Sequence, residues 1–177
     1  SQVERCNQIL KKLSLDPNQE DDFIDEDLAI RDYLRDIISS FKETSNKKFI
    51  LNLNQDLNSK KITKSIEIVY GLRNFIGNAN KFSFNKILIN LKSNSNFTEI
   101  IISDDGSGYP NDILSKIGEP YLKSLKQKDK DKVGLGLGLF IGKTLLEKNF
   151  AELSFRNSET LGGAEVTIRW KNKDLFN

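Results

Sequence analysis

The sequence predicts an α/β fold in which a mixed sheet is covered on one face by helices, a two-layer sandwich. Apolar residues recur every three or four positions over 28–41, 66–79 and 138–148, which is the spacing of amphipathic helices. Runs rich in β-branched and aromatic residues predict five strands, at 48–54, 86–92, 97–103, 151–157 and 164–171. Because the predicted strands alternate with the helices along the chain, we expect one sheet and one core.

The connections between these elements carry turn signals. The polar tetrapeptide 93–96 separates two strand runs and predicts a hairpin, and residues 159–163 predict a second one. Residues 57–61 are expected to form a turn, and 111–117 a short helix. The charged stretch 124–132 has no periodicity and is expected to be a mobile loop.

The chain begins with a segment of a different kind. Val3, Cys6, Leu10 and Leu13 follow the 3-4-3 spacing of a heptad seam, which predicts the end of a helical dimerisation element over 1–15. An isolated surface helix would show the same short pattern. Proline and acidic residues then mark a linker at 16–22, so the main domain is expected at 23–177.

Composition narrows the functional classes. A net charge of +2, from 27 basic and 25 acidic residues, argues against a nucleic-acid or membrane-surface binder. The sequence has no apolar run of about 20 residues and no signal peptide, which predicts a cytoplasmic domain. One cysteine excludes an internal disulfide framework. Histidine and methionine are absent, and we therefore expect a fragment of a longer protein.

The first candidate site lies at the end of the predicted helix 66–79. Asn74 and Asn78 are four residues apart and share one helical face, although asparagine is a mediocre helix former. An amide oxygen suits Mg²⁺, which also relies on substrate phosphates. Lys81 is positioned to reach a phosphate, and Phe82 to pack on a ligand. The alternative is a solvated polar face in an asparagine-rich chain.

The second candidate follows the strand 97–103. Asp104 is followed by Gly106 and Gly108, a turn that brings the backbone close to a ligand. An ionised Asp104 accepts hydrogen bonds only, as from an exocyclic amine. The alternative is a tight turn that uses these residues for conformational reasons. Asp104 and Asp105 are not expected to form a catalytic pair, since adjacent residues of an extended chain point to opposite faces.

The third candidate is a glycine-rich stretch before a helix. Its glycines alternate with leucines in the order Gly134, Leu135, Gly136, Leu137, Gly138, Leu139. A loop of this kind directs free N–H groups at an anion, and the helix dipole that follows favours negative charge. A flexible hinge is the alternative. A dinucleotide-binding oxidoreductase is rejected, because Leu139 stands where the third glycine of Gly-x-Gly-x-x-Gly belongs.

Taken in order, the three segments resemble the N, G1 and G2 boxes of the histidine-kinase ATP-binding domain, a member of the GHKL (Bergerat fold) superfamily. Two weaker boxes agree, and the resemblance covers about residues 23–171. The motifs are Asn74-x-x-x-Asn78-Ala79-x-Lys81-Phe82, Asp104-x-Gly106-x-Gly108, Gly118-Glu119-Pro120-Tyr121, Gly134-x-Gly136-x-Gly138-Leu139 and Gly162-Gly163-Ala164. The stretches 1–10, 118–124 and 134–147 are further similar to redox-responsive sensor kinases of the RegB/PrrB type.

The resemblance implies an ATP site with Mg²⁺ held by Asn78. It implies that Asp104 reads the adenine amine, that 109–133 forms a lid containing Tyr121, and that the N–H groups of 134–138 hold the phosphates. Lys81 would neutralise charge on the transferred phosphoryl group. Asn74 stands where hydrolysing relatives carry a glutamate base, which favours transfer to histidine over hydrolysis.

The implied partners lie outside this chain. The phospho-accepting histidine would belong to a dimerisation domain upstream of Ser1, in a membrane-anchored homodimer that signals to a response regulator. Cys6, on the dimer seam, is a candidate for redox modification, with a small apolar filler as the alternative. A nucleotide-binding scaffold without catalysis and a GHKL ATPase are the rival functions.

Overall fold

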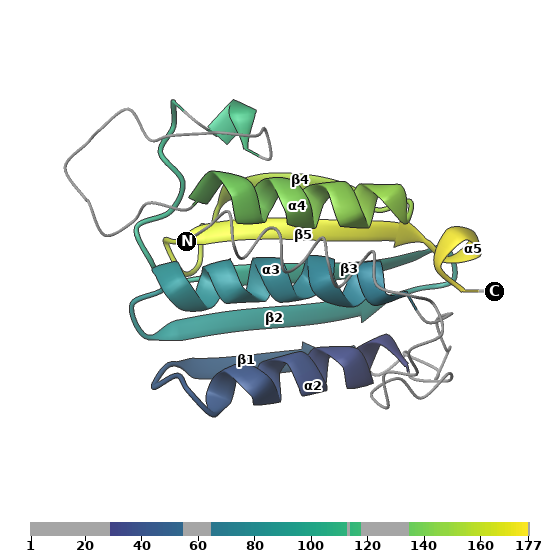
Figure 1. The fold of residues 1–177 in the computed structure, drawn as a ribbon, viewed down its shortest axis with the longest axis horizontal. Helices are drawn as coiled ribbons and strands as arrows, with labels where there is room; N and C mark the ends of the chain where they lie inside the picture. The colour runs from purple at the N-terminus through teal and green to yellow at the C-terminus, as the bar shows by residue number, and fades with distance from the viewer. Residues whose placement is uncertain (1–28, 55–64, 113, 118–134, 177) are drawn as a thin grey trace, which may run out of the picture.

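The structure, a computed structural model, describes residues 29–54, 65–112, 114–117 and 135–176. Three helices and five strands make up the body of the domain (Figure 1). The elements in chain order are α2 (Ile30–Lys42), β1 (Lys48–Leu53), α3 (Ile66–Phe82), β2 (Lys86–Ser93), β3 (Phe97–Asp104), the 3-10 helix η1 (Leu114–Lys116), α4 (Leu135–Lys148), β4 (Glu152–Asn157), β5 (Ala164–Lys171) and the short α5 (Asn172–Leu175).

The strands form one mixed sheet in the order β1-β2-β3-β5-β4. β1 and β2 are parallel because α3 connects them, whereas the other neighbours are antiparallel. Both predicted hairpins are present: β2 pairs with β3, and β4 with β5. The chain therefore forms the mixed sheet that its sequence predicts.

Helices α2, α3 and α4 lie over the same face of the sheet, so the fold is the predicted two-layer α/β sandwich (Figure 1). Alternate residues of the central strands face the helices and form the core. Its fully buried members include Leu34, Leu72, Ile76, Ile87, Ile89, Ile100, Ile168 and Trp170. Within the described residues, no helix has the length and apolar character that a membrane crossing needs.

Helices α3 and α4 pack against each other in opposite directions, with glycines at the contact (Figure 1). A methyl group on Gly71 would lie 2.6 Å from the Leu146 side chain, and one on Gly142 would lie 3.0 Å from the Phe75 ring. Larger residues at either position would push the helices apart. The closeness of this pair brings the start of α4 onto the end of α3.

Three predicted boundaries differ from the structure. α4 begins at Leu135 rather than at Gly138, so the expected glycine loop is largely the first turn of a helix. Burial of Leu139 and close packing on α3 offset the entropic cost of helical glycine. α3 continues to Phe82, and the predicted helix 111–117 is the 3-10 turn η1. The predictions for 1–22, 57–61 and 124–132 lie outside the described residues.

Candidate functional site

The two asparagines of α3 face the first turns of α4. A methyl group placed on Gly138 would lie 3.7 Å from Asn74 Oδ1 and 3.7 Å from both polar atoms of the Asn78 amide. The predicted shared face of Asn74 and Asn78 is therefore present. Both amides are directed at the segment that the sequence selected for anion binding.

The two amides differ in their hydrogen bonding. Asn74 Nδ2 donates to the Tyr70 carbonyl at 2.9 Å, one turn earlier in the helix, which fixes the orientation of the side chain. Asn78 Nδ2 is buried and finds no acceptor among the described residues. A buried donor without a partner costs about 1–3 kcal/mol. This atom therefore indicates a place where a ligand with acceptor oxygens would restore a missing hydrogen bond.

The helix start beside Asn78 can hold an anion. The first N–H groups of any helix lack partners within it, and the helix dipole adds partial positive charge there. In α4 these include the N–H groups of residues 135–137. Leu139 is only 2% exposed and belongs to the core, so its side chain anchors the start of α4.

Asp104 ends β3 and is 3% exposed. Its Oδ1 accepts from the Gly106 N–H at 2.8 Å and from the Ala164 N–H at 3.2 Å. Burial raises the pKa of Asp104 above its ordinary value, although both hydrogen bonds oppose the change. No hydrogen bond to Oδ2 is present within the described residues, which leaves this oxygen as the acceptor for a ligand amine.

Two glycines allow the chain to close around Asp104. A methyl group on Gly163 would lie 2.2 Å from Asp104 Oδ1, and one on Gly106 would lie 2.2 Å from the Phe82 carbonyl oxygen. Gly163 also donates its N–H to the Asp104 carbonyl at 3.1 Å. A side chain at Gly106 would push against the end of α3, and one at Gly163 would push against Asp104 itself. The Gly162-Gly163-Ala164 motif thus contacts the Asp104-x-Gly106-x-Gly108 motif, although Asp104 and Ala164 are 60 positions apart in the chain.

Asp105 points elsewhere, as expected for the neighbour of Asp104. Its Oδ1 accepts from the N–H groups of Phe84 at 2.9 Å, Asn85 at 3.0 Å and Lys86 at 3.0 Å. These bonds hold the turn between α3 and β2. The two aspartates therefore have separate structural roles, and the structure agrees with the rejection of a catalytic pair.

Sequence reasoning missed Asn157. This residue of β4 accepts from the Tyr109 N–H at 2.6 Å and donates to the Tyr109 carbonyl at 2.9 Å. Gly108, with φ +77°, lies against the same amide, and a methyl group on it would lie 2.7 Å from Asn157 Oδ1. The only signal was an asparagine in a strand, where asparagine is depleted. Tyr109 is buried, so the first residue of the predicted lid belongs to the core.

The other predicted residues have less defined positions. Lys81 is exposed, with Nζ 5.3 Å from the centre of the half-buried Phe82 ring. Cys6, Tyr121 and Gly134 lie outside the described residues, as do the side chains of Leu135 and Leu137. The described part of the chain holds no group of three or more carboxylate, histidine or cysteine ligands. A metal bound at Asn78 would therefore take most of its ligands from water and phosphate.

Comparison with known proteins agrees with this geometry. Residues 63–174 match the family "Histidine kinase-, DNA gyrase B-, and HSP90-like ATPase". Over 102 residues the chain is 36% identical to sensor histidine kinase RegB of Cereibacter sphaeroides, an alignment that covers 55% of this chain and 22% of RegB. The chain thus spans about a fifth of that relative.

Solved structures share the fold. The mycobacterial sensor histidine kinase MprB superposes with a TM-score of 0.68 at 18% identity, covering 82% of this chain and 97% of MprB. Full-length ShkA in complex with AMPPNP superposes with a TM-score of 0.66 at 19% identity, covering 81% of this chain and 30% of ShkA. The predicted fold class and the predicted membership of the GHKL superfamily are therefore confirmed.

Proposed function

Because this chain belongs to the family of histidine kinase-, DNA gyrase B- and HSP90-like ATPases, we propose that it binds Mg-ATP between α3, the start of α4 and the end of β3. One observation carries the proposal. The amide of Asn78 on α3, whose nitrogen has no hydrogen-bond partner within the described residues, lies beside Gly138 near the start of α4. At the end of α3, Gly106 lies between the Phe82 carbonyl and the Asp104 carboxylate. A triphosphate at the start of α4 would accept a hydrogen bond from Asn78, and an adenine at the end of β3 would donate one to Asp104.

Each residue has a defined part in this proposal. Asp104 accepts from the adenine amine, with its second oxygen directed to the ligand. Asn78 supplies an amide to the phosphates and their Mg²⁺, whose chemistry is to neutralise phosphate charge. The N–H groups of 135–137 hold phosphate oxygens. Lys81, Phe82 and Tyr121 stay candidates for contacts that form when nucleotide is bound.

We further propose transfer of the γ-phosphoryl group to a histidine rather than to water. Asn74 holds a hydrogen bond to the α3 backbone, and an amide does not abstract a proton from water at neutral pH. The chain contains no histidine, so the acceptor must belong to another segment or chain. That acceptor would be a histidine of a dimerisation domain upstream of residue 1, in a membrane-anchored homodimer. A response regulator would receive the phosphoryl group next.

Two measurements test these proposals in order. Calorimetric titration of the 177-residue chain with AMPPNP and Mg²⁺ should give one site, and Asn78→Ala should weaken it at least about tenfold. No heat of binding would reject the site. Labelled ATP and a supplied histidine-bearing dimerisation domain should then give a phosphorylated domain. Nucleotide binding without transfer would favour the scaffold alternative, and rapid phosphate release would favour the ATPase alternative.

A further inference from the structure

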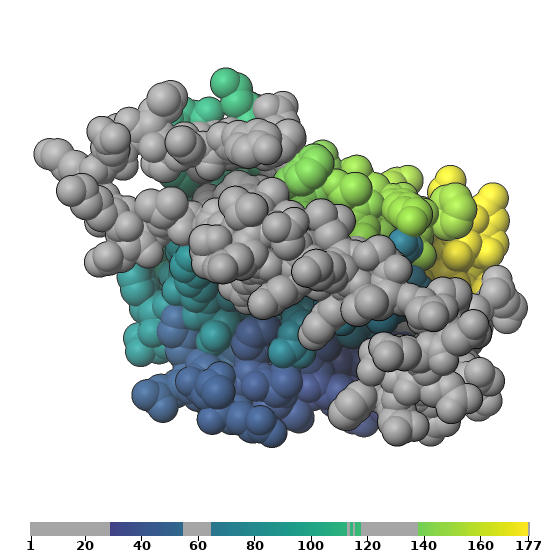
Figure 2. Space-filling view, in the orientation of Figure 1, coloured from purple at the N-terminus to yellow at the C-terminus, as the bar shows by residue number. Residues whose placement is uncertain are grey.

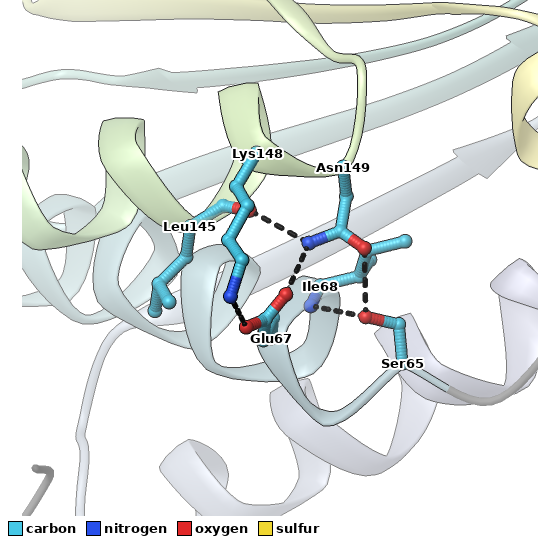
Figure 3. Close-up of polar contacts among 6 residues, drawn as sticks. All are labelled: Ser65, Glu67, Ile68, Leu145, Lys148 and Asn149. Atoms are coloured by element: carbon cyan, nitrogen blue, oxygen red, sulfur yellow. Dashed lines mark hydrogen bonds and ion pairs between the residues drawn. The ribbon is translucent and has the colours of Figure 1, made fainter. Parts of the chain in front are cut away.

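A second group of polar contacts joins α3 and α4 at the ends farthest from the nucleotide site (Figure 3). Asn149, which directly follows α4, is its centre. Asn149 Nδ2 donates to Glu67 Oε2 at 2.8 Å and to the Leu145 carbonyl at 2.9 Å. Asn149 Oδ1 accepts from the Ser65 hydroxyl at 3.1 Å. One side chain therefore binds both the start of α3 and the end of α4.

The orientation of Asn149 is determined by its partners. A carboxylate and a carbonyl only accept hydrogen bonds, so they require the amide nitrogen. Ser65 in turn caps α3, because its hydroxyl oxygen accepts from the Ile68 N–H at 3.3 Å. The Asn149 backbone carbonyl accepts from the indole N–H of the buried Trp170 at 3.2 Å. Asn149 is thus held by the sheet below it as well as by both helices.

An ion pair completes the group, which we call the α3–α4 clamp (Ser65, Glu67, Lys148 and Asn149). Lys148 Nζ lies 2.6 Å from Glu67 Oε1. The Lys148 side chain is 68% exposed, and exposed ion pairs contribute little. The end of α4 and α5 are at the surface of the domain (Figure 2). Asn149, rather than the ion pair, is therefore the directional part of the clamp.

Between the clamp and the nucleotide site, no hydrogen bond joins α3 to α4 within the described residues. Glycines bring the two helices close there, as where Gly71 faces Leu146 and Gly142 faces Phe75. Apolar contacts are non-directional, whereas hydrogen bonds fix the positions of the atoms that they join. The clamp and the site are about 16 Å apart along each helix, eleven residues at 1.5 Å each. A shift of α4 at the clamp would displace Gly138 relative to Asn74 and Asn78.

We propose that Glu67 and Asn149 are positioning residues, which set the register of α4 on α3 and thereby place the phosphate-binding N–H groups opposite Asn78. The proposal rests on the proposed function, since it assigns phosphate binding to the start of α4. The proposal predicts different effects on the two parts of the ligand. Phosphates depend on the register of α4, whereas adenine depends on Asp104, which belongs to the sheet.

The test compares two ligands in the full 177-residue chain. Affinity for AMPPNP with Mg²⁺ is measured by calorimetry, and affinity for adenosine, which has no phosphates, by ligand-observed NMR. Asn149→Ala and Glu67→Ala should weaken AMPPNP binding about three- to thirtyfold, the range for substitutions that act on a site from a distance. Adenosine affinity should change less than about twofold, because Asp104 makes no contact with the clamp.

Three further variants serve as controls. Glu147→Gln removes an ion pair with Lys143 that is confined to α4, and should leave both affinities unchanged. Ile168→Val lowers core stability at a strand residue outside both helices, so it shows what destabilisation alone does. Glu67→Gln keeps an acceptor for Asn149 and should lose less AMPPNP affinity than Glu67→Ala. It also keeps the proposal testable if an alanine variant fails to fold. Circular dichroism establishes that each variant is folded at the temperature of the titration.

The outcomes are distinct. Loss of AMPPNP affinity with retained adenosine affinity supports the proposal. Equal loss for both ligands, or no loss for either in the folded variants, overturns it while leaving the proposed function intact. If the unaltered chain binds neither ligand, the proposed function fails first.

Discussion

Asp104→Asn is the sharpest test of the nucleotide site, because it changes the chemistry of one atom and little else. The two N–H groups of Gly106 and Ala164 bond to Oδ1, which asparagine retains. The second oxygen becomes an NH₂ group, which donates and would face the donating amine of adenine. The loss of a hydrogen bond to a charged acceptor is worth about 1.5–3 kcal/mol, or roughly a 10- to 150-fold weaker affinity for AMPPNP.

The fold should tolerate this substitution. Burial raises the pKa of Asp104, so the ionised form is costly in the native state at neutral pH. A carboxyl with a raised pKa lowers stability above its unfolded pKa, and stability returns as the pH falls through the raised value. Neutral asparagine removes that cost. We expect a melting temperature at pH 7 equal to or above that of the unaltered chain, measured by calorimetry.

A ligand lacking the amine makes the assignment specific. Purine riboside triphosphate differs from ATP by loss of the exocyclic amine, so it should bind the unaltered chain about as weakly as ATP binds Asp104→Asn. The variant should then distinguish the two triphosphates by less than about threefold, since the paired contact is already gone. Asp105→Asn is the matched control, because Asp105 bonds only the turn that contains Phe84. If Asp104→Asn binds ATP within twofold of the unaltered chain, or still prefers ATP strongly, the assignment of Asp104 is wrong.

Three further predictions concern the scaffold. Phe150, two residues after the end of α4, is 68% exposed and has a φ of +66°, a conformation that glycine adopts at no steric cost. Phe150→Gly should therefore raise stability by about 0.5–1 kcal/mol in urea unfolding, and a loss of stability would contradict this account. Gly163→Ala should destabilise the fold by about 1–3 kcal/mol, because its methyl group would overlap Asp104, and an unchanged urea midpoint would refute that overlap. Hydrogen bonds from Lys148 and then Asn149 lower the pKa of Glu67 below its ordinary value of 4.5. The ionised Glu67 therefore stabilises the fold fully above pH 4.5, and this stabilisation is lost as the pH falls through the lowered pKa. The stability difference between Glu67→Gln and the unaltered chain should accordingly be constant from pH 7 to 5 and shrink towards pH 3, whereas a constant difference to pH 3 would exclude the clamp carboxylate as its source.

Much of the architecture follows from local patterns. The 3.6-residue period of 66–79 and the strand runs at 86–92 and 97–103 specify their elements, because each pattern buries one face whatever its neighbours are. The candidate site was predictable for a related reason. Asn74 with Asn78, and Asp104 with Gly106, are pairs close in sequence, so their spacing already determines which side chains share a face or a turn.

The sequence by itself thus determined the class of fold, the order of its elements and the three segments of the site. Only the tertiary structure decided that α4 starts at Leu135, that Gly163 closes on Asp104, and that Asn157 holds Tyr109. It alone also joined Asn149 to Glu67, across 82 residues. The physical reason is that these contacts depend on how closely separate segments pack. A hydrogen bond between distant residues, or a glycine that lets two distant segments approach, produces no periodic pattern in the sequence.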